Sequence, residues 1–345
     1  MNENGNEPTP LNDLGEFGLI DLLSKKIKLR NDSTALGVGD DAALIEQSDK
    51  YTVVSTDLLS EGVHFDLLYT PLKHLGYKAV VVNLSDIYAM NAEPNQITVS
   101  IAVSNRMSVE ALEEIYEGIH LACELYQVDL VGGDTSSSLS GTLISITAIG
   151  EVEKGKEVKR SGAKENDLIC VSGDLGAAFA GLQILEREKS VFSDNEAIQP
   201  DFGGKDYILE RQLKPEARQD LIAYFAKEGI LPSSIIDISD GLSSELIHLA
   251  KASEVGIQIY EEKIPIDPST VTTCEELNLN PTLAALNGGE DYELLFTIPL
   301  DLHDKVKAIP GVSIIGHVTD KNSGHFMVAK GTESMVELKA QGWEH

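Results

Sequence analysis

The chain has 345 residues, of which 56 are acidic and 27 are basic, so its formal net charge is −29. This length allows two domains with full cores, and the excess of acids argues against nucleic acid or an anionic membrane as a partner. No apolar run approaches the roughly 18 residues that span a bilayer, and three scattered cysteines with no signal-peptide pattern favour a cytoplasmic protein.

The first half of the chain predicts a unit of alternating helices and strands. A polar leader over 1–13 precedes apolar residues at helical spacing within 17–27, which predict a first helix. Residues 73–91 are apolar on most faces and too long for one strand, so we expect a buried helix there. Residues 108–127 predict an amphipathic helix with Ser108 as its N-cap. The expected strands cover 42–46, 51–56, 96–103, 128–132 and 141–153.

A second unit follows a polar, basic and glycine-containing stretch at 154–167, which we interpret as a linker. The expected domains therefore cover 14–153 and 154–345, and each is an α/β unit. Residues 188–205 have the pattern of a loop insertion, and Pro215 separates two expected helices. Further helices are expected at 175–187 and 241–253, and further strands in LICVS, IID, GIQIYEE, YELLFTI, VSIIGHV and HFMVA.

Acids recur in short turns that follow apolar or β-branched runs. Loops at the ends of strands place polar groups accurately, so α/β proteins use them for chemistry. Such turns would gather carboxylates around a cation, and Mg2+ prefers a few carboxylates together with phosphate oxygens. The turns are GVGDD (37–41), VVSTD (53–57), VVVNLSD (80–86), LVGGD (130–134), ICVSGD (169–174), IIDISD (235–240) and LNGGED (286–291).

Individual acids in these turns have competing explanations. Ser55, Thr56 and Asp57 together offer hard oxygen ligands that suit Mg2+. Asp86 lies within the expected apolar helix, where a lone carboxylate costs several kcal/mol and must be paired, hydrogen-bonded or metal-bound. An arginine partner or an N-cap role is the simpler alternative for Asp86. Asp240 precedes a predicted helix and could be only its N-cap.

The chain resembles the thiamine-monophosphate kinase family, within the aminoimidazole-ribonucleotide synthetase superfamily, through motifs that follow one another in the family's order. They are GVGDDAAL, STDLLSEGVHF, YKAVVVNLSDIYAM, VGGDTSSS, KRSGAK, IDISDGLSSEL and NGGEDYELLFT. The resemblance runs from about residue 14 to the C-terminus. It implies ATP-dependent transfer of the γ-phosphoryl group to thiamine monophosphate, giving thiamine diphosphate. It also implies a two-domain fold with mixed sheets and a homodimer, in which two N-terminal sheets pair into a barrel with nucleotide sites at the interface.

The resemblance also implies roles for single residues. The implied ligands of several Mg2+ ions are Asp41, Ser55, Thr56, Asp57, Asp86, Asp134, Asp237 and Asp240. The residues implied to hold ATP are Tyr126, Gly133, Asp134, Arg160 and Ser239. The residues implied to contact thiamine monophosphate are His64, Glu290 and Trp343. The acceptor phosphate is already deprotonated near neutral pH, so transfer assisted by ions on Asp57, Asp134 and Asp240 needs no general base.

Simpler explanations compete with several of these roles. His64 could be a structural histidine, Glu290 could cap a turn before a strand, and Trp343 could be a packing anchor. Another ATP-dependent enzyme of the same superfamily, similar to aminoimidazole-ribonucleotide synthetase, is the first alternative function. A non-catalytic acidic protein that binds Ca2+ is the second, although the chain has no D-x-D-x-D-G loop for that ion.

Overall fold

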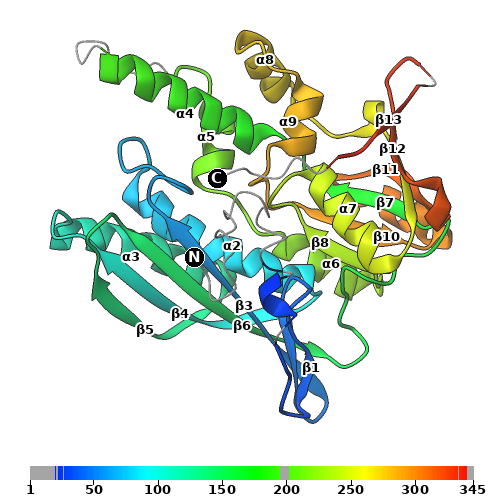
Figure 1. The fold of residues 1–345 in the computed structure, drawn as a ribbon, viewed down its shortest axis with the longest axis horizontal. Helices are drawn as coiled ribbons and strands as arrows, with labels where there is room; N and C mark the ends of the chain where they lie inside the picture. The colour runs from blue at the N-terminus through cyan, green and yellow to red at the C-terminus, as the bar shows by residue number, and fades with distance from the viewer. Residues whose placement is uncertain (1–19, 21, 26, 195–201, 333, 340–345) are drawn as a thin grey trace, which may run out of the picture.

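The computed structural model describes residues 20, 22–25, 27–194, 202–332 and 334–339. They form two sheets with helices packed on them, which Figure 1 shows side by side. The first sheet has the strand order β1-β2-β3-β6-β4-β5, and the second has the order β13-β12-β9-β11-β7-β10-β8. The two-domain fold with mixed sheets is therefore confirmed. The exact boundary after residue 153 stays a prediction.

The first sheet is antiparallel except for its last pair, β4 and β5, which are parallel. Helix α2 packs on β3, β4 and β6, and α3 packs on α2. The layers can be followed in Figure 1, where α2 and α3 lie on one side of this sheet. The strands and helices are β1 (Thr34–Leu36), β2 (Ala43–Glu46), β3 (Lys50–Ser60), α2 (Leu72–Ala89), β4 (Glu93–Val103), α3 (Val109–Tyr126), β5 (Asp129–Ser137) and β6 (Leu143–Glu153).

Helix α2 is apolar on most faces because it is covered on most faces. It touches the first sheet, α3, strand β8 and helix α5, and fourteen of its eighteen residues are buried. The buried helix predicted from its composition is confirmed. Helix α3 is amphipathic as predicted, and Ser108 caps it by accepting a hydrogen bond from the backbone N–H of Ala111.

The second sheet is antiparallel except for the pair β9 and β12. Strand β10, which lies between β7 and β8, is buried along its whole length, which explains its continuous apolar sequence. The strands are β7 (Leu168–Ser172), β8 (Ser234–Asp237), β9 (Gly256–Tyr260), β10 (Leu294–Ile298), β11 (Val312–Thr319), β12 (His325–Val328) and β13 (Met335–Glu337). The α-helices are α4 (Ala177–Asp194), α5 (Asp206–Leu213), α6 (Gln219–Glu228), α7 (Leu242–Ser253), α8 (Pro268–Glu276), α9 (Pro281–Asn287) and α10 (His303–Lys307).

Some local predictions were wrong. The loop expected at 188–205 is helical up to residue 194, because no glycine or proline interrupts the chain before Pro200, and α5 begins again at Asp206. The leader and the start of the first predicted helix lie outside the described residues. None of the described helices combines the length and the apolar character that crossing a bilayer requires.

The acid-bearing turns also differ in part from the prediction. Asp57 does not end its strand, because the apolar residues after it continue β3 to Ser60. Asp134 lies inside β5 for the same reason, since paired residues follow it on that strand. The turn before Glu290 follows helix α9 rather than a strand. Acids on a helix, inside strands and in loops therefore contribute to the site described next.

Candidate active site

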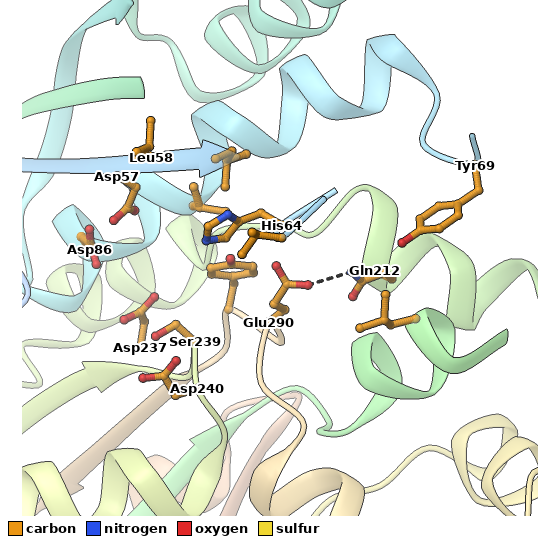
Figure 2. Close-up of a pocket in the computed structure, with 15 residues that line it drawn as sticks. Asp57, Leu58, His64, Tyr69, Asp86, Gln212, Asp237, Ser239, Asp240 and Glu290 are labelled. Atoms are coloured by element: carbon orange, nitrogen blue, oxygen red, sulfur yellow. Dashed lines mark hydrogen bonds between the residues drawn. The ribbon is translucent and has the colours of Figure 1, made fainter. Parts of the chain in front are cut away.

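A pocket with a volume of about 200 Å³ lies where β3, α2 and the end of β8 meet. Seven of the predicted site residues line it: Asp57, His64, Asp86, Asp237, Ser239, Asp240 and Glu290. Figure 2 shows the aspartates together at one end and Glu290 with Gln212 at the other, with His64 between them. The pocket thus has an acidic end and a second end that carries Glu290.

Three carboxylates from separate elements converge beside the acidic end. Asp41 precedes β2, Asp86 lies in α2, and Asp237 is the last residue of β8. One oxygen of each lies within 4.8 Å of those of the other two. The hydroxyl of Ser55 donates a hydrogen bond to Asp86, and that of Ser85 donates to Asp237 at 2.7 Å. Because Asp237 comes from the second sheet, the cluster forms only where the two domains pack together.

Burial raises the pKa of all three carboxyl groups above the ordinary value of 3.8. Burial and the charges of neighbouring acids, above all Asp57, raise the pKa of Asp86 well above this value. Burial and the charge of Asp41 raise the pKa of Asp237 to about 7. Burial also raises the pKa of Asp41, although Arg160 partly opposes the effect. Three ionised acids this close repel one another, so the cluster favours bound protons or a bound cation.

The chemistry of this cluster fits Mg2+. Carboxylate and hydroxyl oxygens are the hard ligands that this ion prefers. Asp41 is 7% exposed, and its Oδ2 atom is buried with no hydrogen-bond partner among the residues that the structure describes. A buried oxygen without a partner costs about 1–3 kcal/mol, and a cation at this position would remove that cost.

Arg160 holds the turn that contains Asp41. Its Nη2 donates to Asp41 Oδ1 at 2.8 Å, and its backbone N–H donates to Asp40 Oδ1 at 3.1 Å. Burial, followed by the charge of Asp41, raises the pKa of Asp40 to about 6. The guanidinium thus lies at the edge of the acidic cluster, where it could also reach a phosphate.

Neighbouring residues of β3 point to opposite faces of the first sheet. Residues that pair across strands share a face, and Asp57 pairs with the buried Ile146 on the α2 side. Ser55 lies on that side as well, where it meets Asp86. Thr56 lies on the other face, where its hydroxyl donates to the carbonyl of Ile146 at 3.0 Å. The structure therefore brings Ser55 and Asp57 to the cluster but directs Thr56 away from it.

Gly133 and Asp134 lie on β5, away from the pocket. Three strand spacings of about 4.8 Å separate β3 from β5, which is about 14 Å. Asp134 is exposed and pairs with Ser100 on the face that points away from α2. A Cβ atom on Gly133 would lie 1.8 Å from the carbonyl oxygen of Val99, so the close pairing of β4 and β5 requires glycine there.

Two loops of the second domain are joined beside the pocket. The backbone N–H of Glu290 donates to the carbonyl of Ser239 at 2.6 Å, and that of Tyr292 donates to Ile238 at 2.9 Å. Asp240 is not the N-cap of α7, because that position is Gly241. The backbone N–H of Asp240 donates instead to Glu245 at 3.0 Å.

The remaining predicted residues are in different surroundings. His64 accepts a hydrogen bond at Nδ1 from the backbone N–H of Ser60 at 3.1 Å, which orients its ring. Tyr126 is buried at the end of α3, where its hydroxyl donates to Glu216 at 3.1 Å and accepts from the N–H of Ala217 at 2.9 Å. Trp343 lies outside the described residues. The roles of these three residues stay predictions.

Sequence reasoning missed several charged or polar residues around the pocket. Lys78 lies in the apolar α2, and Gln212 lies in the last turn of α5; both contact Glu290. Glu245 is buried against Asp240 in the first turn of α7. A lysine inside the run YKAVVV was a usable signal, because a buried ammonium needs a partner just as Asp86 in the same helix does.

The fold and site define a class of protein. Residues 39–152 match the N-terminal domain of AIR synthase related proteins, and residues 164–329 match their C-terminal domain. A solved structure described as "AaThiL complexed with AMPPCP and TMP" has a TM-score of 0.82 to this chain at 35% identity. It covers 99% of this chain and 100% of that one.

Individual relatives identify one family within this class. The chain is 36% identical to the thiamine-monophosphate kinase of Aquifex aeolicus over 335 residues, which are 97% of this chain and 99% of that protein. It is 34% identical to the thiamine-monophosphate kinase of Bacillus subtilis over 342 residues, which are 96% of this chain and 99% of that protein. The chain belongs to the thiamine-monophosphate kinase family.

Proposed function

We propose that this protein transfers the γ-phosphoryl group of ATP to thiamine monophosphate and so produces thiamine diphosphate. The observation that supports this most strongly is the cluster of Asp41, Asp86 and Asp237, which adjoins a pocket containing His64 and Glu290. Identity to thiamine-monophosphate kinases over nearly the whole chain supports the same reaction. So does the solved neighbour, whose description names AMPPCP and TMP.

Both substrates are anionic and the site is acidic, so cations are needed between them. We propose that Asp41, Asp86 and Asp237 hold Mg2+, with Asp57 and Asp240 beside them. When bound, Mg2+ neutralises charge on the phosphates during transfer. The number of ions, and the predicted parts of Ser55, Thr56 and Asp134 in holding them, belong to this proposal.

The chain itself binds and orients the reactants. The acceptor is a phosphate oxygen that carries no proton to remove, so the site needs no general base. Arg160 is a partly exposed guanidinium at the edge of the cluster, and its planar fork suits a phosphate of ATP. We place the phosphate of thiamine monophosphate toward the acidic end of the pocket and its rings toward Glu290.

We further propose that the protein works as a homodimer joined through its first sheet. The sheet face that points away from α2 carries Thr56 and Asp134, and Leu58 on the same face is 52% exposed. A pocket of about 200 Å³ is smaller than the roughly 300–1,000 Å³ of pockets that enclose a drug-sized ligand. A second copy of the chain on this face would cover Leu58 and extend the site over β5.

The cellular setting and the alternatives follow from the same observations. We place the protein in the cytoplasm, because Cys123, Cys170 and Cys274 are all free thiols in buried positions. The alternative of another ATP-dependent activity of the same superfamily, similar to that of aminoimidazole-ribonucleotide synthetase, is disfavoured because relatives of this chain are thiamine-monophosphate kinases. A non-catalytic acidic protein is disfavoured by a pocket formed jointly by two domains.

A product assay tests the proposed function. The purified protein is incubated with ATP, Mg2+ and either thiamine monophosphate or thiamine, and the products, thiamine diphosphate or thiamine monophosphate respectively, are measured by chromatography. We expect rapid formation of thiamine diphosphate from the monophosphate and little reaction of thiamine, whose hydroxyl would first need deprotonation. No thiamine diphosphate from the monophosphate would refute the proposal.

A further inference from the structure

The end of the pocket opposite the aspartates is built around Glu290. Its backbone has a φ of +56°, and Tyr292 two residues later has a φ of +51°. Residues other than glycine seldom adopt this strained conformation, which persists only where the surroundings enforce it. Three groups of contacts enforce it here: the backbone hydrogen bonds to residues 238–239, a partly buried arginine, and two contacts to the Glu290 carboxylate itself.

This arginine is Arg211 of α5, whose side chain is 15% exposed. Its Nη2 donates to the carbonyl of Asp174 at 3.0 Å and to that of Asp291 at 3.3 Å. Its Nη1 donates to Glu293 at 2.9 Å. Arg211 thereby holds the main chain directly after Glu290. The next residue of α5, Gln212, holds the Glu290 side chain.

Two side chains hold the carboxylate of Glu290. Lys78 Nζ forms an ion pair with Oε1 at 3.0 Å, and the Nε2 group of Gln212 donates to Oε2 at 2.7 Å. Lys78 also donates to the backbone carbonyl of Gln212 at 3.1 Å, which closes a ring of three residues. Figure 2 shows the Gln212 amide extending toward Glu290 at this end of the pocket.

The contacts among Lys78, Gln212 and Glu290 connect the two domains. Lys78 belongs to α2 of the first domain, whereas Gln212 and Glu290 belong to the second. Lys78 is 3% exposed, and a buried ammonium without its anion is strongly unfavourable. Lys78 and Glu290 therefore stay together while the domains are packed.

The orientation of Gln212 carries a cost of its own. An ionised carboxylate only accepts hydrogen bonds, so the NH₂ group of Gln212 must face Glu290 and its Oε1 must face away. That oxygen is buried with no hydrogen-bond partner among the described residues. An unsatisfied buried acceptor is unfavourable, so the surrounding contacts hold this amide against Glu290 despite that cost.

We infer that Lys78 and Gln212 are positioning residues, which hold the Glu290 carboxylate in the orientation that receives thiamine monophosphate. A carboxylate has about four acceptor sites, and these two contacts use two of them. The sites that remain can accept N–H groups from the substrate, such as the exocyclic amine of an aminopyrimidine ring. This inference rests on the proposed function and assigns to Lys78 and Gln212 a part in recognising its acceptor.

The test compares the variants Lys78→Met and Gln212→Leu with Glu290→Gln in steady-state assays. We expect each to raise the KM for thiamine monophosphate by about tenfold or more, since each loosens a charge-assisted hydrogen bond. The KM for ATP should change by less than about twofold. Lys214→Met is the matched control, because this lysine directly follows α5, the helix that carries Gln212, and pairs with Glu210 and Glu216 rather than with Glu290.

Double variants separate positioning from general stability. If Lys78 acts through Glu290, then Lys78→Met combined with Glu290→Gln should have the same KM as Glu290→Gln alone, within about twofold. In the same way, Gln212→Leu combined with Glu290→Gln should have the same KM for thiamine monophosphate as Glu290→Gln alone. The Gln212 variants keep the ion pair, so they decide the question even if Lys78→Met does not fold.

The outcomes distinguish the inference from the function on which it rests. A wild-type protein that makes no thiamine diphosphate would refute the proposed function and this inference together. An active wild type, with variants whose KM for thiamine monophosphate is unchanged, would refute the inference alone. Effects that multiply in the double variants, or that raise both KM values equally, would show that Lys78 and Gln212 only stabilise the fold.

Discussion

Replacing Asp237 by asparagine should stabilise the metal-free protein while it abolishes phosphoryl transfer. Asp237 is 3% exposed at the end of β8, and burial together with the charge of Asp41 raises its pKa to about 7. Asparagine has nearly the same shape and keeps an oxygen that can accept from Ser85. The substitution therefore removes a buried charge and changes little else.

The magnitude follows from the pKa of Asp237. The folded protein retains a proton that the unfolded chain releases above about pH 4, so the stability of the wild type falls as pH rises toward 7. The difference between about 7 and 3.8 corresponds to about 4 kcal/mol at 1.36 kcal/mol per pH unit. Asparagine escapes this cost, so we expect a gain of up to about 4 kcal/mol at pH 8 and about 2 kcal/mol at pH 5.

Denaturant unfolding in the presence of a chelator measures this effect. The free energy of unfolding is compared between the wild type and Asp237→Asn at pH 5 and pH 8, and turnover is measured separately with Mg2+. Asp134→Asn serves as the control, because that exposed carboxylate should change stability by less than about 0.5 kcal/mol. A variant that is no more stable than the wild type at pH 8 would refute the electrostatic reasoning.

Two further predictions concern the surface and a helix end. Leu58→Glu places a charge on the uncovered face of the first sheet, so it should shift the protein toward a monomer in analytical ultracentrifugation. A monomeric wild type would contradict the proposed pairing. Ser108→Ala removes the side-chain cap of α3 and should lower the free energy of unfolding by about 1 kcal/mol with turnover unchanged; an unchanged unfolding midpoint would show that this cap is dispensable.

Local sequence patterns predicted the elements whose signals are local. The composition of 73–91 predicted the buried α2, and Ser108 marked the start of α3. Helices α8 and α9 were missed, although each has a local signal. Asp267 and Asn280 cap them, and a proline occupies the first helical position of each. The capping signals were present in the sequence, but both helices are short and no long apolar stripe marks them.

The site was predictable only in part, because its contacts join residues far apart in the chain. An acid inside the apolar sequence of α2 indicated that Asp86 needs partners, and the structure places it with Asp41 and Asp237. No spacing pattern connects Lys78 with Glu290, which lies more than two hundred residues away and in the other domain. Such pairs depend on how the two domains pack, which local patterns do not encode.

The face on which a strand residue lies was equally hard to predict. The triplet at 55–57 looks like one group of oxygen ligands, but alternation along β3 sends Thr56 to the opposite side of the sheet. That opposite side also carries Asp134. The ligand set predicted from the resemblance therefore divides between two faces in one chain, which is the structural reason to expect a second copy at the site.

Transfer of a labelled phosphoryl group tests the central claim most directly. ATP labelled with radioactive phosphorus at the γ-position is incubated with the protein, Mg2+ and thiamine monophosphate, and the products are separated and counted. We predict that the label appears in thiamine diphosphate in a one-to-one ratio with the ADP formed, and that Asp237→Asn transfers almost none. Label found only in inorganic phosphate, or full transfer by Asp237→Asn, would contradict a kinase built on this carboxylate cluster.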